Sequence, residues 1–369
     1  MIKLQTKIIN DAYTEYVYNA YDVQNREISE TVLNHELILP ENFNIGVIFG
    51  SSGSGKSSLL AEFGKIEEPV FDNSKALISN FENLLPEKAS LLLASVGLGS
   101  VPSWLRPYNT LSNGEKYRSS VAKIVSEEKP LYLIDEFASV LDFNTACSLS
   151  NAFQKYVRRT NKKVLLATPR ADILEWLNPD FVFNTTTSQF ERTVYLRPRI
   201  KLQISRCKWD LWKIFQLYHY LTPDLHKSAQ TFLVTWEGKV VAFTSTLDFP
   251  GLPFRAKRFT RTVTLPDFQG LGIGTAVRNY LAGLYLAAGY VCYGRTVNPA
   301  LGEPLAKSGK WQVVLEQKKR NRAKNDLQTH DKKFLKKYLL NRPSYACKYI
   351  GEPIYDNLDI VLKKNKELI

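Results

Sequence analysis

The feature that most limits what this chain can fold into is a glycine-rich loop placed directly after a short apolar run. Residues 45–49 read Ile-Gly-Val-Ile-Phe, which is typical of a buried parallel strand. Gly-Ser-Ser-Gly-Ser-Gly-Lys-Ser follows at 50–57, and a helix-like run begins at Ser58. Such glycines let backbone N–H groups turn toward phosphate oxygens, and the helix N-terminus adds partial positive charge. The pattern therefore predicts an α/β domain that binds a nucleotide.

Two residues of this loop carry expected roles. Lys56 would reach the β- and γ-phosphates, and the Ser57 hydroxyl would bind Mg²⁺. A flexible Gly/Ser linker is the alternative, but a linker needs neither Lys-Ser at its end nor an apolar strand before it. The residues predicted to contact the nucleotide are Gly50, Ser51, Ser52, Gly53, Ser54, Gly55, Lys56, Ser57 and Ser58.

A second strand ends in two carboxylates. The run Leu-Tyr-Leu-Ile at 131–134 precedes Asp135 and Glu136. Such an ending places a carboxylate at the carboxyl edge of the sheet, where ligands of open α/β sheets bind. Asp135 would hold Mg²⁺ through water, and Glu136 would orient or deprotonate the attacking water. Lys56 and Glu136 are therefore the predicted catalytic residues.

Three further motifs give this half a family resemblance. Leu-Ser-Asn-Gly-Glu-Lys lies at 111–116, Ser-Val-Leu-Asp at 139–142, and an apolar strand at 164–168. Together with the phosphate loop they resemble the ATP-binding-cassette (ABC) ATPases over about residues 40–185. The resemblance implies ATP and Mg²⁺ as ligands. Because that family closes each ATP with a second cassette, it also implies an ATP-dependent homodimer in which Ser112 and Gly114 face the partner's nucleotide.

The chain departs from that family at two places. No Gln occurs between Ser57 and Leu111, in a segment too short for the usual transporter-coupling subdomain. Thr-Pro-Arg at 168–170 stands where Thr-x-His is expected, and a guanidinium cannot replace the acceptor nitrogen of a neutral imidazole. ATP binding is thus predicted, and fast hydrolysis is left open. Tyr18 and Tyr21 are candidates for stacking on adenine, with ordinary packing as the alternative.

Charge divides the chain into two halves. Residues 1–200 hold 21 basic and 23 acidic side chains, whereas residues 201–369 hold 28 and 13, a net of +15. The four scattered cysteines form neither a disulfide framework nor a zinc spacing. No signal peptide or membrane span is apparent, so a cytoplasmic location, in a host cell if the protein is viral, is expected. The predicted domains are 1–195, 196–315 and 316–369.

The second half contains another glycine-rich loop. Two β-rich runs at 231–236 and 239–245 surround a Glu-Gly turn, and a third run at 258–265 leads into Pro-Asp-Phe-Gln-Gly-Leu-Gly-Ile-Gly. A dinucleotide fold is disfavoured, because the Gly-x-Gly-x-x-Gly spacing and its following acidic residue are missing. The loop is similar instead to the Gln-x-x-Gly-x-Gly fingerprint of the Gcn5-related N-acetyltransferases (GNAT), over about residues 201–315.

That resemblance implies acetyl-CoA as a ligand and an α+β GNAT domain. Its expected contacts are Leu265, Gln269, Gly270, Leu271, Gly272, Ile273, Gly274, Thr275 and Asn298. Leu305 stands where many members have a tyrosine general acid, with Tyr293 and Ser308 as substitutes. Candidates for the general base are Glu237, Asp248 and Glu303.

The stretch 316–342 is rich in Lys and Arg, and Tyr338, Tyr345 and Tyr349 lie in or after it. This composition favours phosphate contact with stacking on bases, the alternative being a solvated helix face. The sequence as a whole predicts a two-domain α/β protein: a P-loop ABC-type ATPase domain followed by a GNAT domain with a basic C-terminal extension.

Its predicted function is ATP-dependent or ATP-regulated acetyl transfer to an amino group of a nucleic acid. An ATP-gated protein acetyltransferase and a nucleic-acid-binding ATPase with a non-catalytic GNAT module are the alternatives.

Overall fold

A computed structural model describes residues 2–33, 35–192, 194–220, 224–316 and 345–363. The chain forms two compact units. Unit 1 contains residues 1–68, 128–140 and 157–197, and unit 2 contains residues 69–127, 141–156 and 198–369. The phosphate loop and the Asp135-Glu136 pair therefore belong to unit 1, and the Leu111–Lys116 motif belongs to unit 2 together with the basic half.

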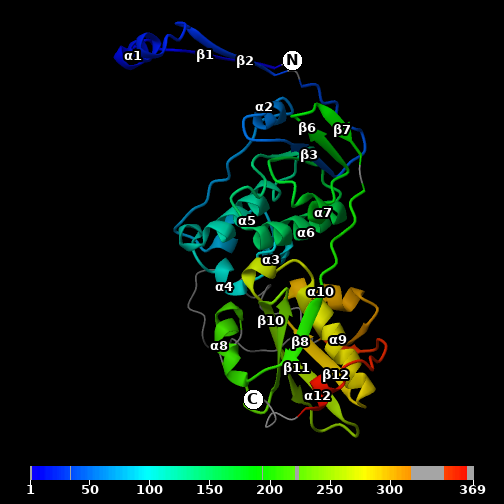
Figure 1. Ribbon diagram of the computed structural model, residues 1–369. Coiled ribbons are helices and arrows are strands. Elements are labelled where there is room, and N and C mark those ends of the chain that lie inside the picture. Colours follow the sequence, from blue (N-terminus) through cyan, green and yellow to red (C-terminus); the bar gives the residue numbers. More distant parts are fainter. Residues whose placement is uncertain (1, 34, 193, 221–223, 317–344, 364–369) are drawn as a thin grey trace. The chain divides into compact units, whose positions relative to one another are not determined.

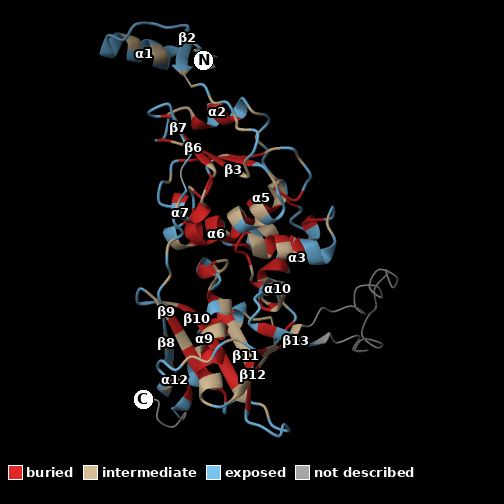
Figure 2. Cartoon of the chain, turned by 90° about the vertical axis from the view of Figure 1, so that its right-hand side faces the viewer, coloured by how far each residue is buried: buried red, intermediate tan, exposed pale blue. Residues whose placement is uncertain are grey.

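Unit 1 is built on a five-stranded sheet in the order β4-β5-β3-β6-β7, of which Figure 1 labels β3, β6 and β7. Its strands are β3 (Ile45–Phe49), β4 (Tyr132–Ile134), β5 (Val164–Thr168), β6 (Phe181–Asn184) and β7 (Gln189–Glu191). The first four run parallel, and β7 is antiparallel to β6. Their near-continuous apolar runs are buried, as parallel strands covered on both faces require (Figure 2).

The start of β3 is fixed by a carboxylate from far along the chain. Asp180 accepts hydrogen bonds from the N–H groups of Asn44 and Ile45, at 2.7 and 2.8 Å, and pairs with Arg158 at 2.8 Å. Burial alone would raise the pKa of Asp180, but these donors outweigh it and hold the pKa below its ordinary value. Asp180 therefore stabilises the sheet as an anion.

We expect Asp180→Ala to lower the stability of unit 1 by about 2 kcal/mol at pH 7, as for loss of hydrogen bonds to a charged group. The folded-state pKa is depressed, so this stabilisation is complete above the unfolded pKa of about 3.9 and is lost as pH falls through the folded value. Urea unfolding of both proteins should show a gap at pH 7 that closes near pH 2. An equal gap at both pH values would contradict this role.

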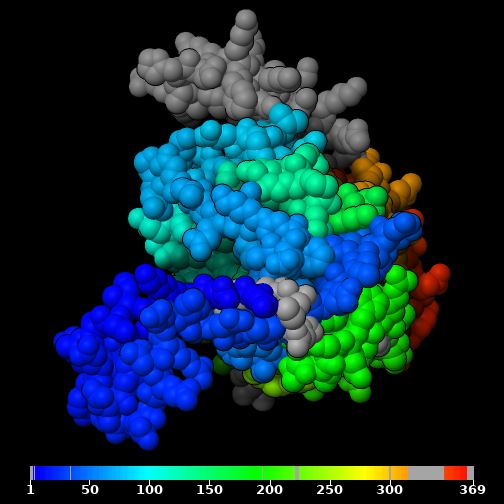
Figure 3. Space-filling view, turned by 90° about the horizontal axis from the view of Figure 1, so that it is seen from above, coloured from blue at the N-terminus to red at the C-terminus, as the bar shows by residue number. Residues whose placement is uncertain are grey.

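A hairpin with an inserted helix precedes the sheet of unit 1. Strands β1 (Ile2–Lys7) and β2 (Ile28–Leu33) pair antiparallel, and α1 (Ala12–Tyr21) lies between them in sequence. None of the α1 residues is buried, and Tyr13, Tyr16 and Tyr21 are well exposed, consistent with the surface seen in Figure 3. Tyr21 is thus an exposed side chain, and its stacking on adenine stays a prediction.

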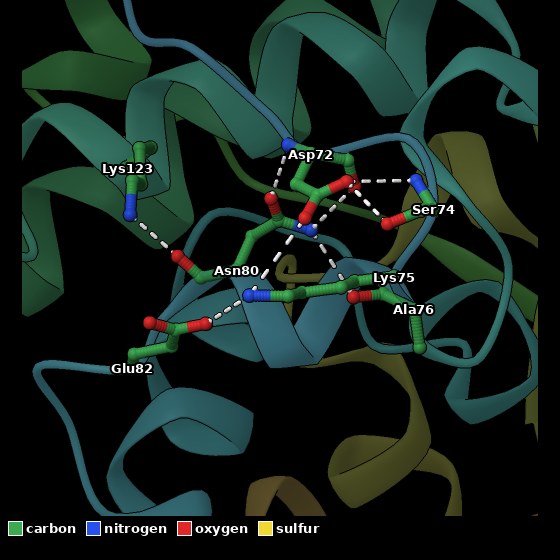
Figure 4. A network of polar contacts seen from close by, with 7 residues as sticks. All are labelled: Asp72, Ser74, Lys75, Ala76, Asn80, Glu82 and Lys123. Carbon is green, nitrogen blue, oxygen red and sulfur yellow. Dashed lines mark hydrogen bonds and ion pairs between the residues drawn. The ribbon is translucent and has the colours of Figure 1, made fainter.

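In unit 2, helices precede the large sheet. They include α3 (Pro86–Ser95), α4 (Val101–Trp104), α5 (Asn113–Ile124) and most of α6 (Phe143–Arg159). A polar network braces the segment before α3 (Figure 4). In it, Asn80 accepts the Asp72 N–H at 2.6 Å, and the Asn80 carbonyl accepts from Lys123 of α5 at 2.5 Å. Lys75 pairs with Asp72 and Glu82.

The sheet of unit 2 has seven strands in the order β13-β14-β12-β11-β10-β9-β8. They are β8 (Leu202–Arg206), β9 (Gln230–Trp236), β10 (Lys239–Asp248), β11 (Ala256–Thr264), β12 (Val291–Thr296), β13 (Trp311–Glu316) and β14 (Tyr345–Tyr349). Neighbours are antiparallel except β11 and β12, which run parallel. That parallel pairing ends at Phe259 and Gly294, although β11 continues to Thr264.

Helices pack on both faces of this sheet. Phe243 of β10 contacts Trp212 and Phe215 around α8 (Trp212–Phe215). The adjacent Thr244 faces the other side, where Thr262 accepts from Arg278 of α9 (Ile273–Ala287). Helix α10 (Pro299–Lys307) follows β12, and α12 (Asp359–Leu362) comes near the end.

The expected C-terminal extension requires a correction. Tyr345–Tyr349 is strand β14, inside the sheet between β12 and β13. Tyr349 is 5% exposed, and its ring packs edge-on against Trp311, so it is not available to stack on a base. The basic residues at 317–342 and Tyr338 lie outside the described residues. No helix in the described part of the chain is long and apolar enough to cross a membrane.

Candidate functional site

The phosphate loop of unit 1 joins β3 to α2 (Lys56–Ala61), as predicted. The Lys56 side chain is 4% exposed, and its ammonium donates to the Ser51 carbonyl at 2.7 Å across the loop. The Ser54 hydroxyl bonds to the Ser51 carbonyl at 2.8 Å and to the Thr185 hydroxyl at 2.6 Å. The loop is thus closed on itself and anchored to the residue that follows β6. No motif in the sequence predicts that Thr185 anchors the loop.

Two glycines show why this loop suits a phosphate. At Gly50 a Cβ would lie 2.1 Å from the Thr185 hydroxyl, so no side chain fits there. At Gly53, with φ +77°, a Cβ would meet no atom within 4 Å, so the backbone borders open space. Exposed backbone around a buried Lys ammonium is the donor set that phosphate oxygens require. The residues present therefore fit the nucleotide.

The carboxylate pair follows β4 in a strained turn. Glu136 and Ala138 have φ of +47° and +60°, a region rarely adopted by residues other than Gly. Asp135 accepts the Glu136 N–H at 2.8 Å, and the Phe137 N–H and carbonyl bond to Ala167 and Thr168 at the end of β5. Strain at such a turn is often kept for function. Glu136 is exposed, and Asp135 and Ser57 offer the oxygen ligands that Mg²⁺ takes.

The Arg170 side chain is held by contacts within unit 1. Its guanidinium forms two contacts to Asp172, at 3.0 and 2.6 Å, and donates to the Ala138 carbonyl at 3.1 Å. The hydrogen bond from Arg170 is the main cause that holds the pKa of Asp172 below its ordinary value. Arg170 therefore braces the turn after Glu136. Its partner Asp172 could not be identified from the motif.

The Leu-Ser-Asn-Gly-Glu motif of unit 2 forms the start of α5. Ser112 is the N-cap residue, and its hydroxyl accepts the Glu115 N–H at 3.3 Å. Glu115 accepts the Ser112 N–H at 2.9 Å and the Ser103 hydroxyl at 2.7 Å. This reciprocal arrangement is a capping box, and it explains how Glu serves in this variant of the motif.

We expect Glu115→Ala to destabilise unit 2 by about 1–2 kcal/mol, because the cap and the buried Ser103 bond are lost together. Glu115→Gln keeps an acceptor oxygen and should lose less than half as much. Thermal unfolding of the two variants measures this directly. Equal losses would show that charge, rather than the cap, is what Glu115 contributes.

The second glycine-rich loop joins β11 to α9 within unit 2. Gly270 and Gly272 have φ of +94° and +86°, and a Cβ at Gly272 would meet no atom within 4 Å. Gln269 donates to the Thr264 carbonyl at 2.9 Å, which folds the loop back on the end of β11. The loop thus has the left-handed glycines that an anion-binding turn requires.

A polar cluster lies where β11 and β12 separate. The Tyr220 hydroxyl is 3.5 Å from the Thr296 hydroxyl, and the His219 ring stacks on Tyr220. Burial, and then the charges of Arg261 and Arg278, lower the pKa of His219 to about 4, so it is neutral at pH 7. No sequence pattern marks this cluster, because 76 residues separate Tyr220 from Thr296.

The other predicted residues of this unit are placed as follows. Leu305 is buried, and the Ser308 hydroxyl donates to its carbonyl at 2.7 Å. Tyr293 of β12 contacts the Phe249 ring and is the strand partner of Arg258 in β11, before the two strands separate.

The remaining predicted residues make local contacts. The Asn298 N–H donates to the Thr296 hydroxyl at 3.1 Å. Glu303 pairs with Lys307, and Asp248 pairs with Lys257. The predicted roles of all these residues remain predictions.

Comparison with known proteins identifies relatives for part of the chain. No protein-family model matches it. It is 28% identical over 183 residues to the methionine import ATP-binding protein MetN of Vibrio cholerae, covering 38% of this chain and 52% of that protein. It is 29% identical over 170 residues to the aliphatic sulfonates import ATP-binding protein SsuB 2 of Rhodococcus jostii, covering 39% and 68%.

Among solved structures, the dimeric structure of a bacterial ABC transporter cassette matches 46% of this chain and 93% of its own, with 16% identity and a TM-score of 0.37. The chain spans about half the length of the first curated relative. Over about two fifths of its length the chain is therefore similar in sequence to ATP-binding proteins of ABC import systems. None of the relatives named here is an acetyltransferase.

Proposed function

We propose that this protein is an ATP-regulated acyltransferase that uses acetyl-CoA to modify an amino group. The observation that carries the proposal is the sheet of unit 2. Its two central strands, β11 and β12, run parallel and pair only from Ala256 to Phe259 and from Val291 to Gly294. Residues Thr260–Thr264 of β11 extend beyond that pairing. An edge of this kind can accept an extended ligand between two strands.

The loop at the end of this edge supports the same conclusion. β11 ends at Thr264, and the turn with Gly270 and Gly272 leads directly into the fifteen-residue helix α9. A pyrophosphate is suited to the backbone N–H groups of such a turn, and the pantetheine arm is suited to the edge of β11 that faces β12 beyond their pairing. Strand order, loop and helix thus agree with the GNAT resemblance of the sequence.

Acetyl-CoA, when bound, supplies a thioester as the acyl donor. The acceptor nitrogen forms a bond to the acetyl carbon, the carbon–sulfur bond breaks, and the nitrogen loses a proton while the sulfur gains one. Tyr220 is the residue we assign to proton transfer, because its hydroxyl lies beside Thr296 at the strand separation and Leu305 cannot serve. The neutral His219 stacked on it is the candidate base.

We infer that the acceptor is a nucleic acid. The net charge of +15 after residue 200 exceeds what a CoA ligand would neutralise, and a surplus of this kind favours a polyanion. A base amine is hard to reach inside a stack, so extrusion of the base would be needed. An ATP-gated protein acetyltransferase and a non-catalytic module on a DNA-binding ATPase are the competing functions.

In unit 1 we assign Lys56 and the loop amides to ATP, Ser57 and Asp135 to Mg²⁺, and Glu136 to the attacking water. Binding of a second copy through Ser112 and Gly114 would complete the site. Light scattering of the Glu136→Gln variant with ATP tests that dimer, and a persistent monomer would contradict it.

The acyltransferase is tested by incubating the protein with radiolabelled acetyl-CoA and DNA, tRNA or cell-extract protein, each with and without ATP. Label in nucleic acid supports the proposal, and label confined to protein supports the first competitor. Failure to bind acetyl-CoA in calorimetry would refute both. A flat salt dependence of DNA affinity would refute the phosphate contacts.

A further inference from the structure

The loop before α9 is held by the helices that carry the ABC motifs of unit 2. Three side chains of α5 and α6 donate to its carbonyl oxygens. Arg118 donates to Pro266 at 2.9 Å, Ser148 to Asp267 at 2.6 Å, and Asn151 to Gly270 at 2.8 Å. In return, the Gln269 side chain accepts the Gly99 N–H at 2.7 Å. We call Arg118, Ser148 and Asn151 the loop clamp.

The clamp is buried and tightly packed. Arg118 is 1% exposed and also donates to the Gly97 carbonyl at 3.4 Å. Burial lowers the pKa of Arg118, against the opposing charges of Asp267, Glu115 and Asp142. At Gly270 a Cβ would lie 2.6 Å from the Ala152 Cβ and 3.1 Å from the Ser148 carbonyl. Helix α6 therefore lies directly against the loop backbone.

This arrangement orients the loop. The Pro266–Phe268 turn uses its own amides, since the Phe268 N–H donates to the Leu265 carbonyl at 3.0 Å and the Gln269 N–H to the Pro266 carbonyl at 3.4 Å. The N–H groups of the first turn of α9, at residues 273–275, have no partner within the helix, and they are the donors that a pyrophosphate would use. An anion-binding loop is preorganised when its backbone is fixed before the ligand arrives.

The helices of the clamp begin at nucleotide motifs. Ser112, the N-cap of α5, lies six residues before Arg118, and Asp142 of the Ser-Val-Leu-Asp motif lies six residues before Ser148. Asp142 accepts the Thr145 N–H at 3.1 Å in the first turn of α6. Because a helix transmits a shift of its first turn along its axis, a change at either motif would move the clamp.

We propose that Arg118, Ser148 and Asn151 are positioning residues that couple the nucleotide state to the affinity of the loop for acyl-CoA. The proposal rests on the proposed function for its ligand. The contacts themselves join a signature-type helix to the loop whatever that ligand is. By linkage, ATP and CoA then change each other's affinity by the same factor.

The test measures the Kd of CoA by calorimetry on the full chain, in the Glu136→Gln background, with and without ATP. We expect a ratio of about 5 or more between the two states, the usual lower range of allosteric coupling. Arg118→Met should bring that ratio close to 1 while leaving the Kd of ATP without CoA unchanged. A ratio of 1 before the substitution, or an unchanged ratio after it, would overturn the coupling.

Two serines of α6 supply a matched pair that avoids a large buried change. Ser148 and Ser150 are both fully buried, but only the Ser148 hydroxyl bonds to the loop, and the Ser150 hydroxyl has no hydrogen-bond partner. Ser148→Ala should weaken CoA binding in the ATP state by about 3-fold or more, as loss of one hydrogen bond does. Ser150→Ala should leave it unchanged, and equal effects would refute the clamp.

Hydrogen exchange separates this proposal from the proposed function. Without CoA, ATP should change the exchange rates of amides 268–275 at least 3-fold, and Arg118→Met should abolish that change. Exchange that responds to ATP in a protein that fails to bind CoA would sustain the coupling and reject acyl-CoA as the ligand. Exchange at 268–275 that is indifferent to ATP would reject the coupling itself.

Discussion

Replacing Lys56 with Ala should weaken ATP binding by at least 100-fold. The Lys56 ammonium is almost fully buried and is held over the loop by the Ser51 carbonyl, where its charge is poorly screened. Bound phosphates would exchange that single neutral acceptor for negatively charged oxygens, so that both the donor and the acceptor of the hydrogen bond carry charge. Loss of the ammonium leaves the phosphates with backbone donors alone.

The measurement is the Kd of a fluorescent ATP analogue with Mg²⁺. Lys65→Ala is the control, because Lys65 lies on an exposed stretch just after the same helix and changes the net charge equally. Binding that falls in both variants would indicate a general charge effect. Unchanged binding in Lys56→Ala would show that the loop does not hold a nucleotide.

The second large effect is expected from Gly270→Val, which should weaken CoA binding at least 10-fold. A Cβ at this position overlaps the Ala152 Cβ and approaches the Ser148 carbonyl, and φ is +94°, which β-branched residues avoid. The loop must move away from α6, so its carbonyls lose the clamp and its amides lose their orientation.

The control variant Gly289→Ala separates the effect of backbone strain on CoA binding from the effect of steric overlap. Gly289 also has a positive φ, +80°, but a Cβ there meets no atom within 4 Å. This control should lower thermal stability slightly and leave CoA affinity intact. Circular dichroism verifies that Gly270→Val is folded. A folded Gly270→Val protein with the original CoA affinity would contradict the position of the ligand at this loop.

The sequence predicted those parts of the fold that depend on local patterns. Strands β3 and β5 match the apolar runs at 45–49 and 164–168, and the β9–β10 hairpin follows from the Glu-Gly turn. Long-range contacts left no local signal. Asp180 caps β3 across 135 residues, and Arg118 reaches Pro266 across 148. Periodicity and spacing describe one element at a time, and these contacts join distant ones.

The same limit explains the corrections. The charge run before residue 343 obscured a short strand at Tyr345–Tyr349, in which the Tyr349 ring packs against Trp311. The Thr-Pro-Arg motif likewise gives no sign that Arg170 pairs with Asp172, because Asp172 lies outside the motif. The role of a side chain that contacts another helix or strand depends on the fold, so the motif around that side chain does not predict it.

The central claim, that nucleotide binding controls acyl transfer, is tested most directly by one assay. Transfer of label from radiolabelled acetyl-CoA to DNA or tRNA is followed in the Glu136→Gln protein, with and without ATP, beside the same protein carrying Arg118→Met. We predict transfer that depends on ATP by about 5-fold or more, and loss of this dependence in the Arg118→Met protein. Transfer at the same rate with and without ATP would contradict the account.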